Sequence, residues 1–145
     1  MPLKSFHPLV RNWFRSEFGQ PTPAQSEGWP AIQRNENTLI LAPTGSGKTL
    51  SAFLWAIDSL VVDHLDKQTE HGLRVIYVSP LKALPNDIEK NLQAPLEGIS
   101  RLAEADGLHL SPIRTAVRTG DTPPSELRAF SKSPPEILIT TPESL

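Results

Sequence analysis

The fold of this chain is decided by one stretch, which reads Thr38-Leu39-Ile40-Leu41-Ala42-Pro43-Thr44-Gly45-Ser46-Gly47-Lys48-Thr49. Residues 38–42 are mostly apolar and predict a buried strand, and a helical pattern of apolar residues begins at Lys48. A glycine-rich turn between a strand and a helix is typical of phosphate binding, because curled backbone N–H groups and the helix N-terminus face the same anion. The stretch therefore predicts a site for a nucleoside triphosphate.

Individual residues of this loop suit separate tasks. Gly45 and Gly47 permit the curled backbone, and the Lys48 ammonium would reach the β- and γ-phosphates. The Thr49 hydroxyl would bind Mg²⁺, so Lys48 and Thr49 are the expected catalytic residues. The general pattern begins with glycine where this chain has Ala42, and the alternative is a glycine-rich turn with an incidental lysine. The expected nucleotide contacts in the loop are Pro43, Thr44, Gly45, Ser46, Gly47, Lys48 and Thr49.

Length and composition narrow the class of protein. With 145 residues, the chain is one domain or part of one. Its formal net charge of −2 excludes a strongly basic nucleic-acid footprint, so any such binding depends on local groups. Cysteine is absent, which excludes disulfides and thiolate metal sites. The N-terminus lacks the apolar core of a signal peptide and no apolar run could cross a bilayer, so we expect a cytoplasmic protein without membrane contact.

The rest of the chain alternates between helical and strand patterns. Two N-terminal helices are predicted within residues 1–37. The first is indicated by apolar residues at helical spacing that end at a capping Gly19, and the second by a capping box of Thr22 with Gln25. In residues 38–145, strands alternate with helices, which indicates an α/β domain with a largely parallel sheet. The expected strands are 38–42, 74–78, 115–118 and 136–140, and the expected helices are 48–65, 81–102 with breaks at Pro85 and Pro95, and 123–130.

Each loop of unusual composition follows one of these strands. In a parallel sheet, ligands bind beyond the carboxyl ends of the strands. We therefore expect four loops to lie along one edge of the sheet: Ala42–Thr49, Ser79–Leu84, Thr119–Asp121 and Thr140–Glu143.

Several motifs together resemble a known family. Besides the phosphate loop they are Phe18-Gly19, Pro21 to Gln25, Ser79 to Leu84, Arg118 to Thr122 and Thr140 to Leu145. This set resembles the first RecA-like domain of superfamily 2 (DEAD/DEAH-type) helicases, and within them it is most similar to the large helicase-related (Lhr) family. The resemblance implies a three-layer P-loop NTPase fold and the ATP- and nucleic-acid-binding segment of an ATP-dependent DNA or RNA helicase. ATP and Mg²⁺ are the implied cofactors.

The resemblance also gives roles to residues outside the phosphate loop. Gln25 matches the glutamine that reads adenine, and an amide can pair with adenine N6 and N7. The alternative is that Gln25 only closes its capping box, and both roles can hold together. Phe6 is the nearest candidate for the aromatic residue that stacks on the base, whereas Phe14 and Phe18 are expected in the core.

Three loops match the family's contacts to single-stranded DNA or RNA. Such loops hold a strand by its phosphates through backbone N–H groups, hydroxyls and helix N-termini, and Lys82 would add a charge-assisted contact. The alternatives are that the prolines only begin helices and that Gly120 only permits a turn. The implied nucleic-acid contacts are Pro80, Leu81, Lys82, Thr119, Gly120, Thr141, Pro142 and Glu143.

The family pattern also contains an acidic strand end that this sequence lacks. Hydrolysis needs one carboxylate for Mg²⁺ and another to activate water, and no strand here ends in Asp-Glu. We therefore expect an N-terminal piece of a helicase whose missing C-terminal core is its partner, and which alone binds nucleotide without turnover. Two alternatives are another P-loop enzyme, such as a kinase or transport ATPase, and a non-enzymatic nucleotide- or nucleic-acid-binding module. By family analogy, the role would be repair-linked 3′-to-5′ translocation on single-stranded DNA.

Overall fold

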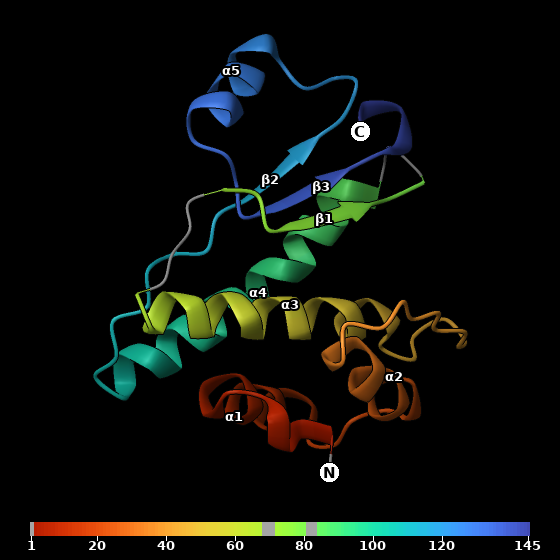
Figure 1. The fold of residues 1–145 in the computed structure, drawn as a ribbon, viewed down its shortest axis with the longest axis vertical. Coiled ribbons are helices and arrows are strands. Elements are labelled where there is room, and N and C mark those ends of the chain that lie inside the picture. The colour runs from red at the N-terminus through yellow and green to blue at the C-terminus, as the bar shows by residue number, and fades with distance from the viewer. Residues whose placement is uncertain (1, 68–71, 81–83) are drawn as a thin grey trace. The chain divides into compact units, whose positions relative to one another are not determined.

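The computed structural model of this protein describes residues 2–67, 72–80 and 84–145. Contacts divide the chain into two compact units, Met1–Lys67 with Gly98–Leu110 and Gln68–Glu97 with Ser111–Leu145. Along the chain (Figure 1) the elements are η1 (Pro2–Ser5), α1 (Pro8–Phe18), α2 (Pro23–Gln33), α3 (Lys48–Leu65), β1 (Val75–Val78), α4 (Leu84–Ala105), β2 (Thr115–Arg118), α5 (Pro124–Lys132), β3 (Ile137–Thr140) and η2 (Pro142–Ser144).

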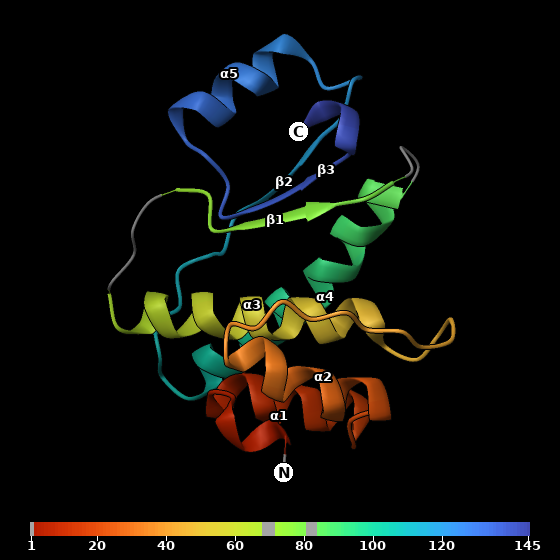
Figure 2. The ribbon, with the colours of Figure 1, turned by 45° about the vertical axis from the view of Figure 1, so that its right-hand side comes forward.

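The first unit is built around α3, against which α2 packs (Figure 2). The predicted apolar stripe of α3 is confirmed at Phe53, Leu54, Ile57 and Val61, which are all buried, while Leu50 at its start is half-buried. Burial of each such side chain contributes about 1.5–3 kcal/mol. The stripe therefore fixes how the helix that begins at Lys48 lies against its neighbours.

The ends of the N-terminal helices lie where the sequence predicts them. The Gly19 N–H donates to the Arg15 carbonyl and closes α1. Both halves of the capping box are present at the start of α2: the Gln25 N–H donates to the Thr22 hydroxyl, and the Thr22 N–H donates to the Gln25 side chain. Local hydrogen bonds thus fix the end of α1 and the start of α2, the two helices that precede the phosphate loop in the chain.

The second unit contains a parallel sheet in the order β1-β3-β2 (Figure 1). β3 lies in the middle, and its Ile137 and Ile139 side chains are fully buried. Val78 and Arg118 are both register partners of Thr140, so the three strands end at the same level. The predicted α/β class, the parallel pairing and the common edge of these three strands are confirmed.

The predicted strand at residues 38–42 is wrong for this structure, which has no strand there. Leu39 and Leu41 are 82% and 85% exposed. Ile40 is half-buried and lies against Gly28 of α2. The apolar pattern is that of a strand, but pairing needs a neighbour, and no described strand lies in register with it. The segment stays extended and unpaired.

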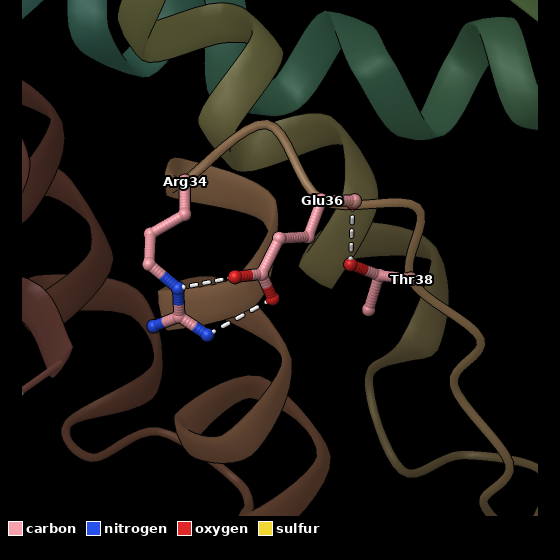
Figure 3. A network of polar contacts seen from close by, with 3 residues as sticks. All are labelled: Arg34, Glu36 and Thr38. Atoms are coloured by element: carbon pink, nitrogen blue, oxygen red, sulfur yellow. Dashed lines mark hydrogen bonds and ion pairs between the residues drawn. The ribbon is translucent and has the colours of Figure 1, made fainter.

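A polar turn connects α2 to this segment (Figure 3). The Arg34 guanidinium donates to both carboxylate oxygens of Glu36, at 2.7 and 3.0 Å, and the Thr38 hydroxyl donates to the Glu36 carbonyl at 2.8 Å. The hydrogen bond from Arg34 lowers the pKa of the Glu36 carboxyl. The pair is exposed to solvent, so it shapes the turn and adds little to stability.

α4 differs from its prediction in continuity. A break was expected at Pro85 and Pro95, but the helix runs unbroken from Leu84 to Ala105. Pro85 is the second residue of the helix. A proline there costs no hydrogen bond, because the N–H groups of the first turn have no partner within the helix. Pro95 removes one bond inside the helix, and the buried side chains of Leu92 and Ile99 on either side favour continuation. The predicted start at residue 81 lies outside the described residues.

α4 ends at Ala105, three residues beyond its predicted end. The other predicted boundaries agree within two residues, and α5 begins at Pro124 with Pro123 as its N-cap. Among the described residues, no helix is both long enough and apolar enough to cross a membrane.

Candidate nucleotide and nucleic-acid sites

The phosphate loop has the backbone that its glycines permit. Gly45 and Gly47 have φ values of 82° and 80°, and Gly47 is the left-handed N-cap of α3. A Cβ atom on Gly47 would lie 2.5 Å from the Gln25 side-chain nitrogen. Glycine is therefore favoured at this position by its φ, and a Cβ there would also displace the Gln25 amide.

The Lys48 side chain closes back over the loop. Its Nζ donates to the carbonyl of Ala42 and, at 2.7 Å, to that of Pro43. An ammonium has three donors, so one remains for a further acceptor. The side chain that sequence analysis assigns to phosphate is thus held at the mouth of the loop by the loop's own carbonyls.

α2 holds the loop from the other side. The Thr22 hydroxyl donates to the Ser46 carbonyl at 2.8 Å, and the Gln25 side-chain nitrogen donates to the Gly47 carbonyl at 3.4 Å. Gln25 itself is buried. Its amide oxygen and nitrogen each have one hydrogen-bonding position left after these contacts. Closing the capping box is therefore compatible with reading a base edge.

The loop residues fit a triphosphate and Mg²⁺. The Ser46 hydroxyl oxygen is buried without a hydrogen-bond partner among the described residues, and such an orphaned group calls for a ligand or water. The Thr49 side chain is exposed at the first turn of α3, where a hydroxyl can join the shell of a hard cation. No group of three or more His, Cys, Asp or Glu in the described residues could bind a metal on its own.

The aromatic predictions are corrected by burial. Phe6 is only 2% exposed and packs edge-on against Trp29 and Trp55, so it cannot stack on a base. Phe18 was expected in the core and is 55% exposed, with its ring beside those of Trp13 and Phe14. Phe14 is buried as predicted. The error arose because helical spacing at the last residue of α1 does not specify what covers that turn.

In the second unit, three loops leave the level ends of the strands. We call Ser79-Pro80, Thr119–Asp121 and Thr141–Glu143 the strand-end loops. The Ser79 N–H donates to the Thr140 carbonyl at 2.8 Å, which extends the pairing of β1 and β3 beyond Val78. The common edge thus unites three of the four predicted loops, while the phosphate loop belongs to the other unit.

The loop after β2 is closed by its own threonines. The Thr119 N–H donates to the Thr122 hydroxyl at 2.8 Å, and the Thr122 N–H donates to the Thr119 carbonyl at 3.1 Å. The Asp121 N–H donates to the Thr119 hydroxyl at 3.3 Å. These bonds leave Gly120 exposed at the tip.

The predicted nucleic-acid contacts differ in how they are presented. Pro80, Pro142 and Glu143 are exposed beside Gly120, whereas the Thr141 side chain is buried and bonded to the Ser144 hydroxyl at 3.3 Å. Thr141 therefore stabilises its own loop through this hydrogen bond and is not presented to solvent. Leu81 and Lys82 lie outside the described residues.

A cavity of about 540 Å³ lies beside the loop after β2. Its lining includes the carboxylates of Glu89, Asp121 and Glu126 and contains no lysine or arginine. Acidic walls disfavour phosphate. The cavity therefore does not suit a phosphate backbone.

Two buried side chains of the first unit make hydrogen bonds that the sequence did not predict. The Trp29 indole N–H donates to the Ser51 carbonyl at 2.9 Å. Asp58 is 3% exposed and accepts a hydrogen bond from the His7 N–H at 2.7 Å. Burial raises the pKa of the Asp58 carboxyl to about 6, and the bond from His7 opposes this rise. The only signal was a polar residue within the apolar stripe of α3.

The glycine loop, the helix that follows it and the parallel sheet define a RecA-like P-loop protein. The DEAD/DEAH box helicase profile matches residues 22–145, and the chain belongs to this family. It is 55% identical over 144 residues to the Lhr helicase/probable uracil glycosylase of Mycolicibacterium smegmatis, covering 99% of this chain and 9% of that protein. It is 52% identical to the ATP-dependent helicase Lhr-Core protein 2 of Thermococcus barophilus, covering 94% of this chain and 16% of that protein.

A solved structure supports the same assignment. The structure of Mycobacterium smegmatis helicase Lhr bound to ssDNA and AMP-PNP matches with a TM-score of 0.90 and 55% identity, covering 99% of this chain and 18% of that one. The predicted resemblance to Lhr helicases and the RecA-like fold are confirmed. The chain spans less than a fifth of the length of these relatives.

Proposed function

We propose that this chain binds ATP with Mg²⁺ at the phosphate loop and single-stranded nucleic acid at the strand-end loops, as the front part of a helicase motor. One observation carries the proposal: Thr22, the N-cap of α2, and Gln25 within α2 donate hydrogen bonds to the carbonyls of Ser46 and Gly47. Gln25, the residue proposed to read adenine, thus also helps to hold the phosphate loop. The Lhr relative, whose structure contains ssDNA and AMP-PNP, supports both ligands.

Each residue of the nucleotide site has a task in this proposal. Lys48 neutralises phosphate charge with its remaining donor, and Gly47 lets the backbone N–H groups face the anion. Ser46 gives its unpartnered hydroxyl to the ligand. The Thr49 hydroxyl would help to hold the cation, which when bound would screen the phosphate charge. Gln25 uses the free positions of its amide for adenine.

The strand-end loops form the second site. Gly120, Pro142 and Glu143 are exposed at the ends of β2 and β3, so a strand would meet backbone groups and few charges. The Glu143 carboxylate would repel phosphate, and we assign it to a hydroxyl or base contact. Lys82 supplies the positive charge in this proposal.

The chain alone is proposed to bind nucleotide without hydrolysing it. Turnover needs a carboxylate that activates water, and the sequence holds no Asp-Glu pair after a strand. Hydrolysis and duplex unwinding belong to the whole helicase core in this proposal.

Binding measurements with two matched pairs of variants test the function. Lys48→Ala in the full-length protein should weaken AMP-PNP binding by at least about 10-fold, since a charge-assisted contact is lost. Lys67→Ala, an exposed lysine of the same unit, is the control. Equal AMP-PNP affinity in Lys48→Ala and the unmodified protein would reject the nucleotide site.

The nucleic-acid arm uses a fluorescent single-stranded oligonucleotide. Lys82→Ala should lower its affinity and reduce the salt slope by about 1, as expected for one phosphate contact. Lys132→Ala on α5 is the control. An unchanged salt slope in Lys82→Ala would remove Lys82 from the proposed path.

A further inference from the structure

Trp29 lies on α2 one helical turn after Gln25 and is fully buried. Its indole N–H donates to the Ser51 carbonyl at 2.9 Å, in the first turn of α3. A buried indole needs an acceptor, and here that acceptor belongs to the helix that the phosphate loop begins. Trp29 therefore connects α2 to the first turn of α3, just after the phosphate loop.

The connection continues from Ser51 to the loop. The Ser51 hydroxyl donates to the Gly47 carbonyl at 2.9 Å, and the Ser51 N–H donates to the same oxygen at 3.0 Å. The Gln25 side chain donates to this oxygen as well. The Gly47 carbonyl thus lies where two paths from α2 meet, one through Gln25 and one through Trp29 and Ser51.

The orientation of the indole is itself fixed. The Phe6 ring lies edge-on at a centroid distance of 4.9 Å and the Phe14 ring at 5.5 Å, with interplanar angles of 70° and 82°. Rings that enclose a buried indole on two sides restrict its rotation. The indole N–H is therefore held towards Ser51 by Phe6, which follows η1, and by Phe14 of α1.

We infer that Trp29 is a positioning residue of the phosphate loop. Its indole N–H holds the first turn of α3 so that Gly47 keeps its left-handed backbone and the loop N–H groups face one anion. This inference rests on the proposed nucleotide site. Trp29 touches no ligand in this account and acts through Ser51 and Gly47.

The test is Trp29→Phe in the full-length protein, which removes the indole N–H and keeps an aromatic ring. Loss of one hydrogen bond of ordinary net strength should weaken AMP-PNP binding by about 5-fold. Affinity for single-stranded oligonucleotide without nucleotide should stay within about 2-fold, since the strand-end loops belong to the other unit. Trp13→Phe is the matched control, because Trp13 is buried in the same unit and packs against Phe18.

Ser51→Ala supplies a second measurement if Trp29→Phe folds poorly. It removes the hydroxyl bond to Gly47 without touching the aromatic core, and AMP-PNP affinity should fall in the same direction. The inference is overturned if both variants bind AMP-PNP like the unmodified protein, or if Trp13→Phe loses as much affinity as Trp29→Phe. Lys48→Ala, measured alongside, separates a failure of the Trp29 inference from a failure of the proposed nucleotide site. If Lys48→Ala also binds AMP-PNP normally, the nucleotide site itself is wrong.

Discussion

In the proposed function the phosphate loop and the strand-end loops both present backbone groups to phosphate, but the two are held in different ways. Three side chains from α2 and its N-cap hold the phosphate loop and the first turn of α3: those of Thr22, Gln25 and Trp29. The strand-end loops are held by the backbone register of β1, β3 and β2, whose ends are level. One site depends on individual side chains and the other on a ladder of main-chain bonds.

This difference determines what a substitution can do. A main-chain ladder survives the loss of most single side chains, provided that the buried face of the sheet stays filled. A loop held by a few side chains loses its geometry when one of them is removed. We therefore expect stability to respond most to the sheet core, and loop geometry to respond most to α2.

The largest effect is expected at β3. Ile139→Ala should lower the free energy of unfolding by about 2–5 kcal/mol, because it leaves a cavity at a fully buried position of the central strand. Leu41→Ala, at a residue of the same apolar character that is exposed, should change it by less than about 0.5 kcal/mol. Denaturant unfolding of residues 1–145 measures both. A loss at Leu41 equal to that at Ile139 would show that residues 38–42 pack in solution.

The next effect is expected at Thr22. Thr22→Ala removes both an N-cap and the bond to the Ser46 carbonyl, and should lower stability by about 1–2 kcal/mol. Thr22→Ser keeps the hydroxyl and should recover most of this loss. Thermal unfolding of the two variants side by side measures the difference. If serine gave no recovery, the methyl packing and not the hydroxyl would hold the loop.

A smaller, pH-dependent effect is expected at Asp58. Because burial raises its pKa from 3.8 to about 6, the neutral carboxyl stabilises the fold below pH 3.8, and this stabilisation is lost as the pH rises through about 6. Asp58→Asn keeps an acceptor for the His7 N–H without the charge. It should raise stability at pH 8 by on the order of 1 kcal/mol and have no stabilising effect at pH 4. A gain of equal size at both pH values would contradict the assignment.

The smallest effect is expected in the loop after β2. Thr122→Ala removes the acceptor of the Thr119 N–H, yet the register of β2 with β3 remains. Stability should fall by about 0.5–1 kcal/mol, while amide exchange at Thr119 becomes faster. Unchanged exchange at Thr119 would show that the threonine pair does not close this loop.

The elements with local signals were predictable from the sequence. The cap at Gly19, the capping box of Thr22 and Gln25, and the apolar stripe of α3 depend on neighbours within a few residues, and the structure has all of them. The strand β3 was predictable as well, because its apolar run is flanked by prolines and polar residues.

Features that depend on distant partners were not predictable. Residues 38–42 have the pattern of a strand as clear as that of β3, but a strand forms only where a neighbour pairs with it. Phe6 is buried and Phe18 is exposed, against expectation, because spacing does not tell which helix face another element covers. The bond of Trp29 to Ser51 joins residues 22 positions apart, and no local pattern encodes it.

Backbone hydrogen exchange with each ligand in turn would test the central claim most directly, because it reports both sites in one protein. AMP-PNP with Mg²⁺ should protect the amides of residues 44–49 and leave those of 119–121 and 142–143 unchanged. A single-stranded oligonucleotide should protect the strand-end loops and leave the phosphate loop unchanged. Protection by AMP-PNP that omits residues 44–49, or an oligonucleotide footprint away from all three strand-end loops, would contradict the account.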